Sequence, residues 1–178
     1  APTTPFTVYQ GAIKTKEYIF DDQVPNLKFE IPDTNIDKTK LIVTVSDSIS
    51  STQKEVYIQF SELPGVDGNS ALYFINENPN GKFDISFGDG ILGKKPLPGS
   101  LITFKYLTTD GPAANGLSVF TTSDSLFDGV NKPTIKSSAA SSGGATKESA
   151  ESIRANAPLQ FISQNRAVTV DDYRALVR

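Results

Sequence analysis

Residues 87–93 have the sequence Phe-Gly-Asp-Gly-Ile-Leu-Gly, which is the segment best suited to hold an ion. Glycine lets the backbone approach an ion closely, and Asp89 carries a carboxylate. An EF-hand calcium loop needs oxygen ligands at alternate positions before its glycine and a late Glu, and a phosphate-binding loop needs Gly-Lys-Ser/Thr. Neither pattern is present. We therefore expect a tight turn at a strand end, with Gly88, Asp89 and Gly90 in a structural role and no metal site.

Two adjacent acidic pairs, Asp21-Asp22 and Asp171-Asp172, are the next candidates for acid–base chemistry. A glycosidase needs two carboxyl groups about 5 to 9.5 Å apart, normally on separate elements. Neighbouring residues on a helix point away from one another. The second pair is better explained as acidic residues at the positively polarised start of a helix.

The chain contains no His and no Cys. The usual general base, imidazole and thiolate metal ligands, and Ser-His-Asp or Cys-His arrangements are therefore absent. We expect no catalytic residue, no cofactor and no enzymatic activity. An enzyme would require carboxylates from distant strands to converge across a cleft.

The balance of charge and hydropathy excludes two further classes of partner. A net charge of −3 and a pI near 5.0, with no stripe of Lys and Arg, argue against nucleic acid. No apolar run approaches the ~20 residues that a membrane span requires, so we expect no membrane insertion. The chain has no Met and breaks off in a helical pattern at residues 173–178, which indicates a piece of a longer polypeptide.

Most of the chain has the pattern of β-strands, with short β-branched and aromatic runs between clusters of Pro, Gly, Asn and Asp. We expect an α+β, mainly β fold: an antiparallel β-sandwich or partly open barrel followed by a small helical segment. Asn80-Gly81 predicts a hairpin between the fifth and sixth strands. The predicted strands are residues 16–20, 27–31, 41–46, 56–60, 72–75, 83–87, 101–106 and 117–121.

Composition divides the chain into three parts. Residues 1–135 are expected to form the β-rich domain, with a split into two β subdomains near 65–70 as an alternative. Residues 136–146 are rich in Ser and Gly and predict a flexible linker. Residues 147–178 predict a helical segment that begins a further, truncated domain.

Two helices are predicted in that last segment. Thr146 is expected to cap the first helix and Pro158 to end it. The second is expected to begin at Thr169, because residues 169–172 fit a variant of the capping box. Arginine makes fixed bidentate contacts, so Arg154 and Arg166 are candidates to lock the connector to the helices. A solvated surface arginine is the alternative for each.

The order of these motifs resembles the baseplate J-like proteins of contractile phage tails, and within them the ring-forming wedge subunits of T4-like phages. The resemblance covers residues 72–177. Its motifs are Phe87-Gly88-Asp89-Gly90, then Gly93, Pro96 and Gly99, a strand ending at Tyr106, then Gly111 and Asn115-Gly116, and the blocks 148–158 and 165–173. Carried onto this sequence, they make Arg154, Pro158, Asn165, Arg166, Asp172 and Tyr173 candidate structural or interface residues beside Gly88, Asp89 and Gly90.

The resemblance implies a structural role in the virion. Copies would associate with one another, as dimers or in a ring, and with other wedge proteins in a sixfold baseplate that rearranges before the sheath contracts. Such a protein is synthesised in the host cytoplasm and located in the tail baseplate. The alternative is a carbohydrate- or receptor-binding β-sandwich of a tail component, in which exposed aromatic residues stack on a sugar. Its candidate residues are Tyr18, Tyr57, Phe60, Tyr73 and Phe74.

Overall fold

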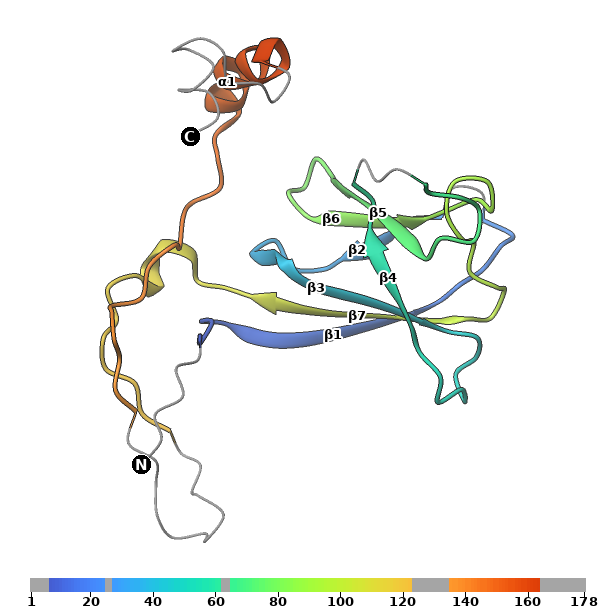
Figure 1. The fold of residues 1–178 in the computed structure, drawn as a ribbon, viewed down its shortest axis with the longest axis horizontal. Coiled ribbons are helices and arrows are strands. Elements are labelled where there is room, and N and C mark those ends of the chain that lie inside the picture. The colour runs from blue at the N-terminus through green and yellow to red at the C-terminus, as the bar shows by residue number, and fades with distance from the viewer. Residues whose placement is uncertain (1–6, 25–26, 62–64, 123–134, 164–178) are drawn as a thin grey trace, which may run out of the picture. The chain divides into compact units, whose positions relative to one another are not determined.

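The computed structural model describes residues 7–24, 27–61, 65–122 and 135–163. The chain divides into two compact units, Ala1–Asp110 and Gly111–Arg178. The described elements are shown in Figure 1. Their bounds are β1 (Ala12–Ile19), β2 (Phe29–Ile31), β3 (Ile36–Ser46), β4 (Glu55–Gln59), β5 (Leu72–Glu77), β6 (Phe83–Phe87), β7 (Leu101–Thr108), the 3-10 helix η1 (Gly111–Ala114) and α1 (Ala150–Ser163).

All the described strands belong to one sheet in the first unit, with the order β1-β7-β3-β4-β5-β6-β2. The predicted β5–β6 hairpin is confirmed, with register Tyr73↔Phe87 to Glu77↔Phe83. Its turn is stabilised by Asn78, whose side-chain oxygen accepts hydrogen bonds from the backbone N–H groups of Asn80 and Lys82. The pairing of β4 with β5 is parallel, which departs from the expected antiparallel sheet.

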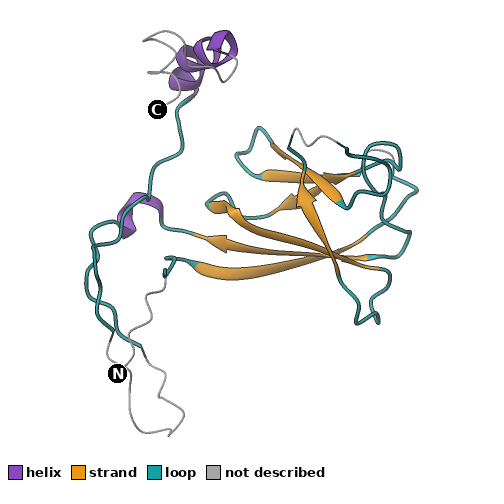
Figure 2. Ribbon diagram, viewed as in Figure 1, coloured by secondary structure: helices purple, strands orange, loops and turns teal. Residues whose placement is uncertain are grey.

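Figure 2 shows that the sheet is strongly twisted, and side-chain contacts connect its two outermost strands, β1 and β2. The Tyr18 hydroxyl on β1 donates a hydrogen bond of 2.6 Å to the carbonyl oxygen of Glu30 on β2. The rings of Tyr18 and Phe29 lie 5.3 Å apart. Side chains thus bridge the gap that backbone pairing leaves open, and of the two expected architectures the partly open barrel is the one observed.

The core lies inside this barrel and is formed by residues at alternate positions of its strands, most clearly in β2 and β6. Ile102, Phe104 and Tyr106 of β7 face inward, as do Val43 of β3 and Ile85 of β6. Strands that bury alternate residues in this way place their other face outward. Burial of these side chains is the main favourable contribution to the stability of the unit.

Asp33 is bonded to side chains of two strands, Lys14 of β1 and Tyr106 of β7. Lys14 donates to Asp33 Oδ1 at 2.5 Å, and the Tyr106 hydroxyl donates to Asp33 Oδ2 at 2.7 Å. These two hydrogen bonds hold the pKa of Asp33 below its ordinary value, and the bond from Lys14 has the larger effect. Burial, and then the neighbouring Asp33, raise the pKa of Tyr106.

Protonation of Asp33 is expected to destabilise the barrel in acid. Because the folded-state pKa is depressed, the stabilisation is present above the unfolded-state pKa of about 3.9 and is lost as the pH falls through the folded value. Asp33→Asn should therefore reduce stability at pH 7 and flatten the loss of stability below about pH 4. Urea midpoints measured from pH 7 to pH 2 test this, with Asp22→Asn in an exposed turn as the control. Parallel pH profiles for wild type and Asp33→Asn would contradict it.

The second unit contains an arm in which two segments run alongside each other. Gly116 N–H donates to the Ser141 carbonyl at 2.8 Å, and Ser141 N–H donates to the Leu117 carbonyl at 2.8 Å. Asn115 and Gly144 exchange a further pair of hydrogen bonds at 2.7 and 2.9 Å. The Ser/Gly-rich residues 136–146 are thus tied to the segment after η1, and a linker between domains remains a prediction.

The predicted strand at residues 117–121 is wrong. This segment has strand-like composition, but Val119 is largely exposed and no sheet forms there. β-propensity reflects packing against neighbours, and such neighbours are absent from the described part of the arm.

The helix α1 begins and ends later than predicted. Ser149, rather than Thr146, caps it, because the Ser149 hydroxyl accepts a hydrogen bond from the backbone N–H of Ser152 at 3.2 Å. Pro158 lies inside the helix, which continues to Ser163, so Pro158 is not the stop. A proline removes one helical hydrogen bond and kinks a helix, yet it need not end it. No helix in the described residues is long and apolar enough to cross a membrane.

Candidate functional site

Residues 88–93, here named the tip loop, form a tight turn after β6, as predicted from the sequence. Asp89 Oδ1 accepts hydrogen bonds from the backbone N–H groups of Ile91 at 2.8 Å and Leu92 at 2.9 Å. Gly90 N–H donates to the Gly93 carbonyl at 3.0 Å. The turn is therefore closed by its own side chain and its own backbone.

The tip loop is held against the segment that precedes β5. Gly93 N–H donates to the Asp67 carbonyl at 3.0 Å, and Lys94 N–H donates to the Ser70 carbonyl at 2.8 Å. The two backbones approach so closely that a Cβ on Gly68 would lie 2.1 Å from the Gly90 carbonyl oxygen. These contacts make the loop a stiff projection.

The carboxylate of Asp89 is used inside the turn. The backbone N–H groups of Leu92 and Ile91 hold its pKa below the ordinary value, so it is charged at neutral pH. Within the described residues, no three acidic side chains gather as a metal site would require. Chemically, the loop presents a fixed negative charge beside whatever side chains it exposes.

Those side chains are apolar. Ile91 is 83% exposed and Leu92 is 44% exposed, and they lie two and three residues after Asp89. A single exposed apolar residue is ordinary, but two on a rigid loop form a preorganised contact because little conformational entropy is lost on binding. This arrangement is suited to protein–protein contact.

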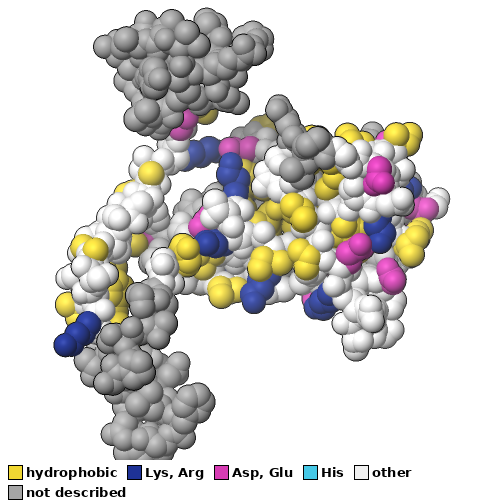
Figure 3. All heavy atoms as spheres, viewed as in Figure 1, with side chains coloured by type: hydrophobic (Ala, Val, Ile, Leu, Met, Phe, Trp, Pro, Cys, Tyr) yellow, Lys and Arg dark blue, Asp and Glu magenta, His cyan; other side chains and the backbone are white. Residues whose placement is uncertain are grey.

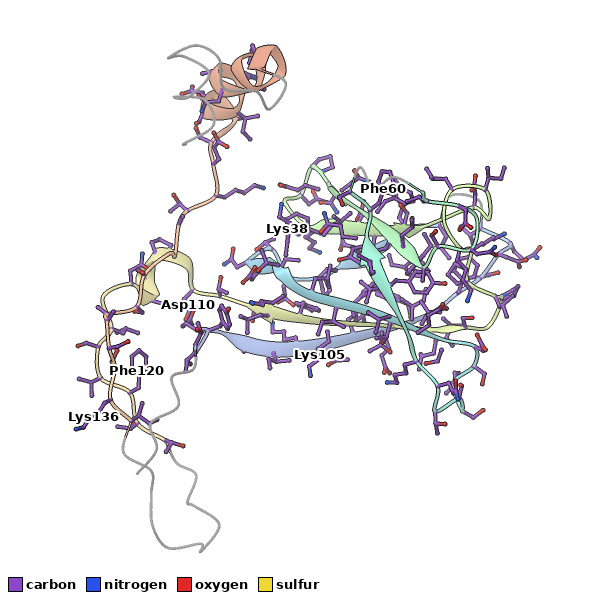
Figure 4. All side chains as sticks on the ribbon, in the orientation of Figure 1. Lys38, Phe60, Lys105, Asp110, Phe120 and Lys136 are labelled. Carbon is purple, nitrogen blue, oxygen red and sulfur yellow. The ribbon has the colours of Figure 1, made fainter. Side chains whose placement is uncertain are left out.

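A second apolar surface, here named the groove, lies on the outer face of β1, β7 and β3, where Figure 4 labels Lys105. It has a volume of about 570 Å³. Ile13 and Ile42 provide its apolar floor, and Lys40 lies over the Tyr9 ring at 3.8 Å from the ring centre. Its lining residues are Thr7, Val8, Tyr9, Gly11, Ile13, Thr39, Lys40, Ile42, Lys105, Tyr106 and Leu107.

The apolar outer face continues beyond the groove onto β4. Val56 is paired with Thr44 of β3, and Ile58 lies on the same face two residues later, both exposed. Figure 3 shows hydrophobic side chains intermixed with charged side chains of both signs over the visible face of the β unit. The outer face of an antiparallel sheet is commonly polar when it faces water, so this face is a candidate for contact with a partner.

Sequence reasoning did not find the groove. The signal was present in residues 41–45, Leu-Ile-Val-Thr-Val, where apolar residues occupy both faces instead of alternating with polar ones. Such a run is typical of a strand covered on both sides. Here Leu41, Val43 and Val45 are buried in the core, whereas Ile42 is 48% exposed.

The remaining predicted site residues lie in or near α1. Arg154 is exposed and forms no ion pair with the described residues. Pro158 is inside α1. Asn165, Arg166, Asp172 and Tyr173 lie outside the described residues, as does the predicted second helix. The structure therefore brings Gly88, Asp89 and Gly90 together and leaves the clamp role of the arginines a prediction.

The aromatic residues considered for sugar binding do not form a common platform. Tyr57 and Tyr73 are buried in the core, and the Tyr18 hydroxyl is bonded across the barrel. Phe60 and Phe74 form a half-buried pair whose rings lie 5.1 Å apart. Core packing accounts for most of this set.

The acidic pair Asp21-Asp22 has a local role. Asp21 accepts a hydrogen bond from the backbone N–H of Gln23, and Asp22 accepts one from the Gln23 side chain. These contacts are typical of a turn, in which Asp side chains bond to nearby backbone groups.

Gly90→Val is expected to destabilise the tip loop. Gly90 has φ +93°, a conformation that costs an ordinary L-residue about 1–2 kcal/mol and a β-branched residue more. A Cβ at this position would meet nothing within 4 Å, so the effect is one of backbone strain alone. Urea unfolding should rank wild type above Gly90→Asn and Gly90→Asn above Gly90→Val. Equal stability of all three would contradict the argument.

Comparison with known proteins relates this chain to the baseplate proteins of phages. No protein-family model matches it. The chain is similar to the baseplate wedge protein gp6 of Enterobacteria phage T4, with 29% identity over an alignment of 191 positions. That alignment covers 94% of this chain but only 27% of the T4 protein, so the chain spans about a quarter of its relative's length.

Proposed function

We propose that this chain is a structural module of a phage tail baseplate, part of a wedge subunit of the J-like family. The observation that carries the proposal is the similarity to a baseplate wedge protein along nearly the whole chain. The rigid apolar tip loop and the apolar groove support it, because an assembly subunit needs complementary surfaces on a stiff support.

In this role the module associates with further copies of itself and with other wedge proteins. The wedge belongs to the contractile tail of the virion, and its packing changes when the baseplate rearranges before sheath contraction. This role requires the module to form and exchange protein–protein contacts. We therefore propose no catalytic activity, no cofactor, no binding of nucleic acid and no membrane insertion. Synthesis takes place in the cytoplasm of the bacterial host.

Immunogold electron microscopy of phage particles that carry the chain tests the location. Antibodies against the β unit should label the tail end that bears the baseplate, and mass spectrometry should find the chain in purified virions. Label on fibre tips would favour the receptor- or carbohydrate-binding alternative. Absence of the chain from virions would overturn the structural role.

A further inference from the structure

We propose that the tip loop of one copy inserts Ile91 and Leu92 into the groove of a second copy, giving a head-to-tail contact. The inference rests on the proposed function in that it supplies the self-association of the wedge module. The contact joins two different surfaces, the tip loop of one copy and the groove of the other. A contact of this kind closes into a ring when the rotation between copies allows, and otherwise forms an open chain.

The tip loop cannot reach the groove of its own chain, because the two lie toward opposite ends of the barrel. Strand β6 runs in the same direction as β1, because the path between them through β7, β3, β4 and β5 contains four antiparallel pairings and one parallel pairing, β4 with β5. The tip loop leaves the end of β6, whereas the groove lies by the start of β1, at Ile13. From Ile13 to Ile19 the strand extends for about 20 Å.

The far end of β1 is tied to the segment that follows the tip loop. Phe20 N–H donates to the Ser100 carbonyl at 2.9 Å, and Gly99 N–H donates to the Phe20 carbonyl at 2.9 Å. The loop is therefore fixed at its end of the barrel, and a second molecule is needed to bring it to a groove.

The two surfaces match in both polarity and charge. Asp89 is the charged residue of the tip loop, and within the described residues its Oδ2 accepts no hydrogen bond. The groove is lined by Lys40 and Lys105 and by no acidic side chain among the described residues. Lys94, next to the loop, is already paired with Glu55 at 2.6 Å. An apolar projection with a negative charge thus faces an apolar groove with positive charges, a pairing that favours the correct register.

Two variants separate the surfaces, and sedimentation velocity over a range of concentrations measures them. Ile91→Asp removes the projection, and Ile42→Asp places a charge in the groove. Each is expected to raise the dissociation constant for self-association roughly tenfold or more, as loss of a central apolar anchor does. Both residues are exposed in the single chain, so melting temperatures should stay close to wild type. Ile49→Asp, at a 67% exposed position elsewhere, is the matched control and should associate as wild type does.

Mixing the two variants gives the decisive result. A head-to-tail contact leaves an intact groove on Ile91→Asp and an intact tip loop on Ile42→Asp, so the mixture should form 1:1 dimers that neither variant forms alone. Failure of the mixture to dimerise would overturn the proposal in favour of a contact between identical surfaces.

Two other results would also overturn the contact without touching the proposed function. If both variants form assemblies of the same mass as wild type, self-association uses other surfaces. If the wild-type chain stays monomeric at all concentrations, the chain does not self-associate. The immunogold experiment decides the baseplate role independently.

Lys105→Glu tests the contribution of charge to the contact. It should weaken association more at low salt than at high salt.

Discussion

Phe104→Ala is expected to lower the free energy of unfolding of the β unit by about 3–5 kcal/mol, the usual cost of deleting a buried Phe ring. Phe104 is fully buried in β7, which pairs with β1 on one side and β3 on the other. Its ring lies 5.7 Å from that of Tyr18 and 6.4 Å from that of Phe29. The truncation removes the Phe104 ring from the aromatic cluster that holds β1 and β2 together through side chains, so contacts across that gap are lost as well.

Urea unfolding followed by circular dichroism measures this loss. Phe104→Leu should retain most of the stability because it keeps much of the apolar volume. Lys105→Ala, the next residue along β7 but outside the core, should remain within about 0.5 kcal/mol of wild type. A loss below about 1 kcal/mol for Phe104→Ala would show that the core is not organised around this ring.

Strand positions in the barrel were predictable because most strands bury one face. In β6 the buried residues Phe83 and Ile85 flank a half-buried Asp84, and the observed strand has the predicted bounds. The same alternation does not specify how strands pair. The parallel pair of β4 and β5 follows from the long connection between them, whose end contacts, such as Phe60 N–H to the Tyr73 carbonyl, are set by tertiary packing.

The candidate site was only half predictable for a related reason. The tip loop is local: Asp89 caps N–H groups two and three residues away, a pattern visible in the sequence. The groove is assembled from segments far apart in the chain, with Tyr9, Ile42 and Lys105 meeting only in the folded barrel. Such a surface appears in sequence as an apolar residue on the wrong face of a strand, as at Ile42.

Two predictions from local sequence were wrong because tertiary structure overrides local propensity. Residues 117–121 have the composition of a strand, but among the described residues the backbone of Leu117 bonds to Ser141 and Val119 is 84% exposed. Pro158 has the chemistry of a helix stop, but helix α1 tolerates it and continues for a further five residues to Ser163. In both cases the residue type was identified correctly and its surroundings decided the outcome.

Gly88→Ala is expected to destabilise the tip loop by about 3 kcal/mol, at the upper end of the usual cost of overpacking. A Cβ at this buried position would lie 2.2 Å from the Gly93 carbonyl oxygen and 2.5 Å from that of Leu92. Both neighbours are backbone atoms, so the methyl group can be accommodated only if the loop itself moves. Gly99→Ala is the matched control, because it also replaces a glycine in a turn but would meet nothing within 4 Å. It should cost about 1 kcal/mol from its positive φ alone.

Moving the loop also moves the side chains that it presents, so Gly88→Ala should weaken self-association as well as folding. Ile91→Asp, by contrast, should weaken self-association and leave the urea midpoint unchanged, because the Ile91 side chain is 83% exposed in the single chain. Measuring both quantities for both variants distinguishes the residue that supports the contact from the residue that makes it. If Gly88→Ala unfolds at a lower urea concentration but associates as tightly as wild type, the tip loop is not the contact surface.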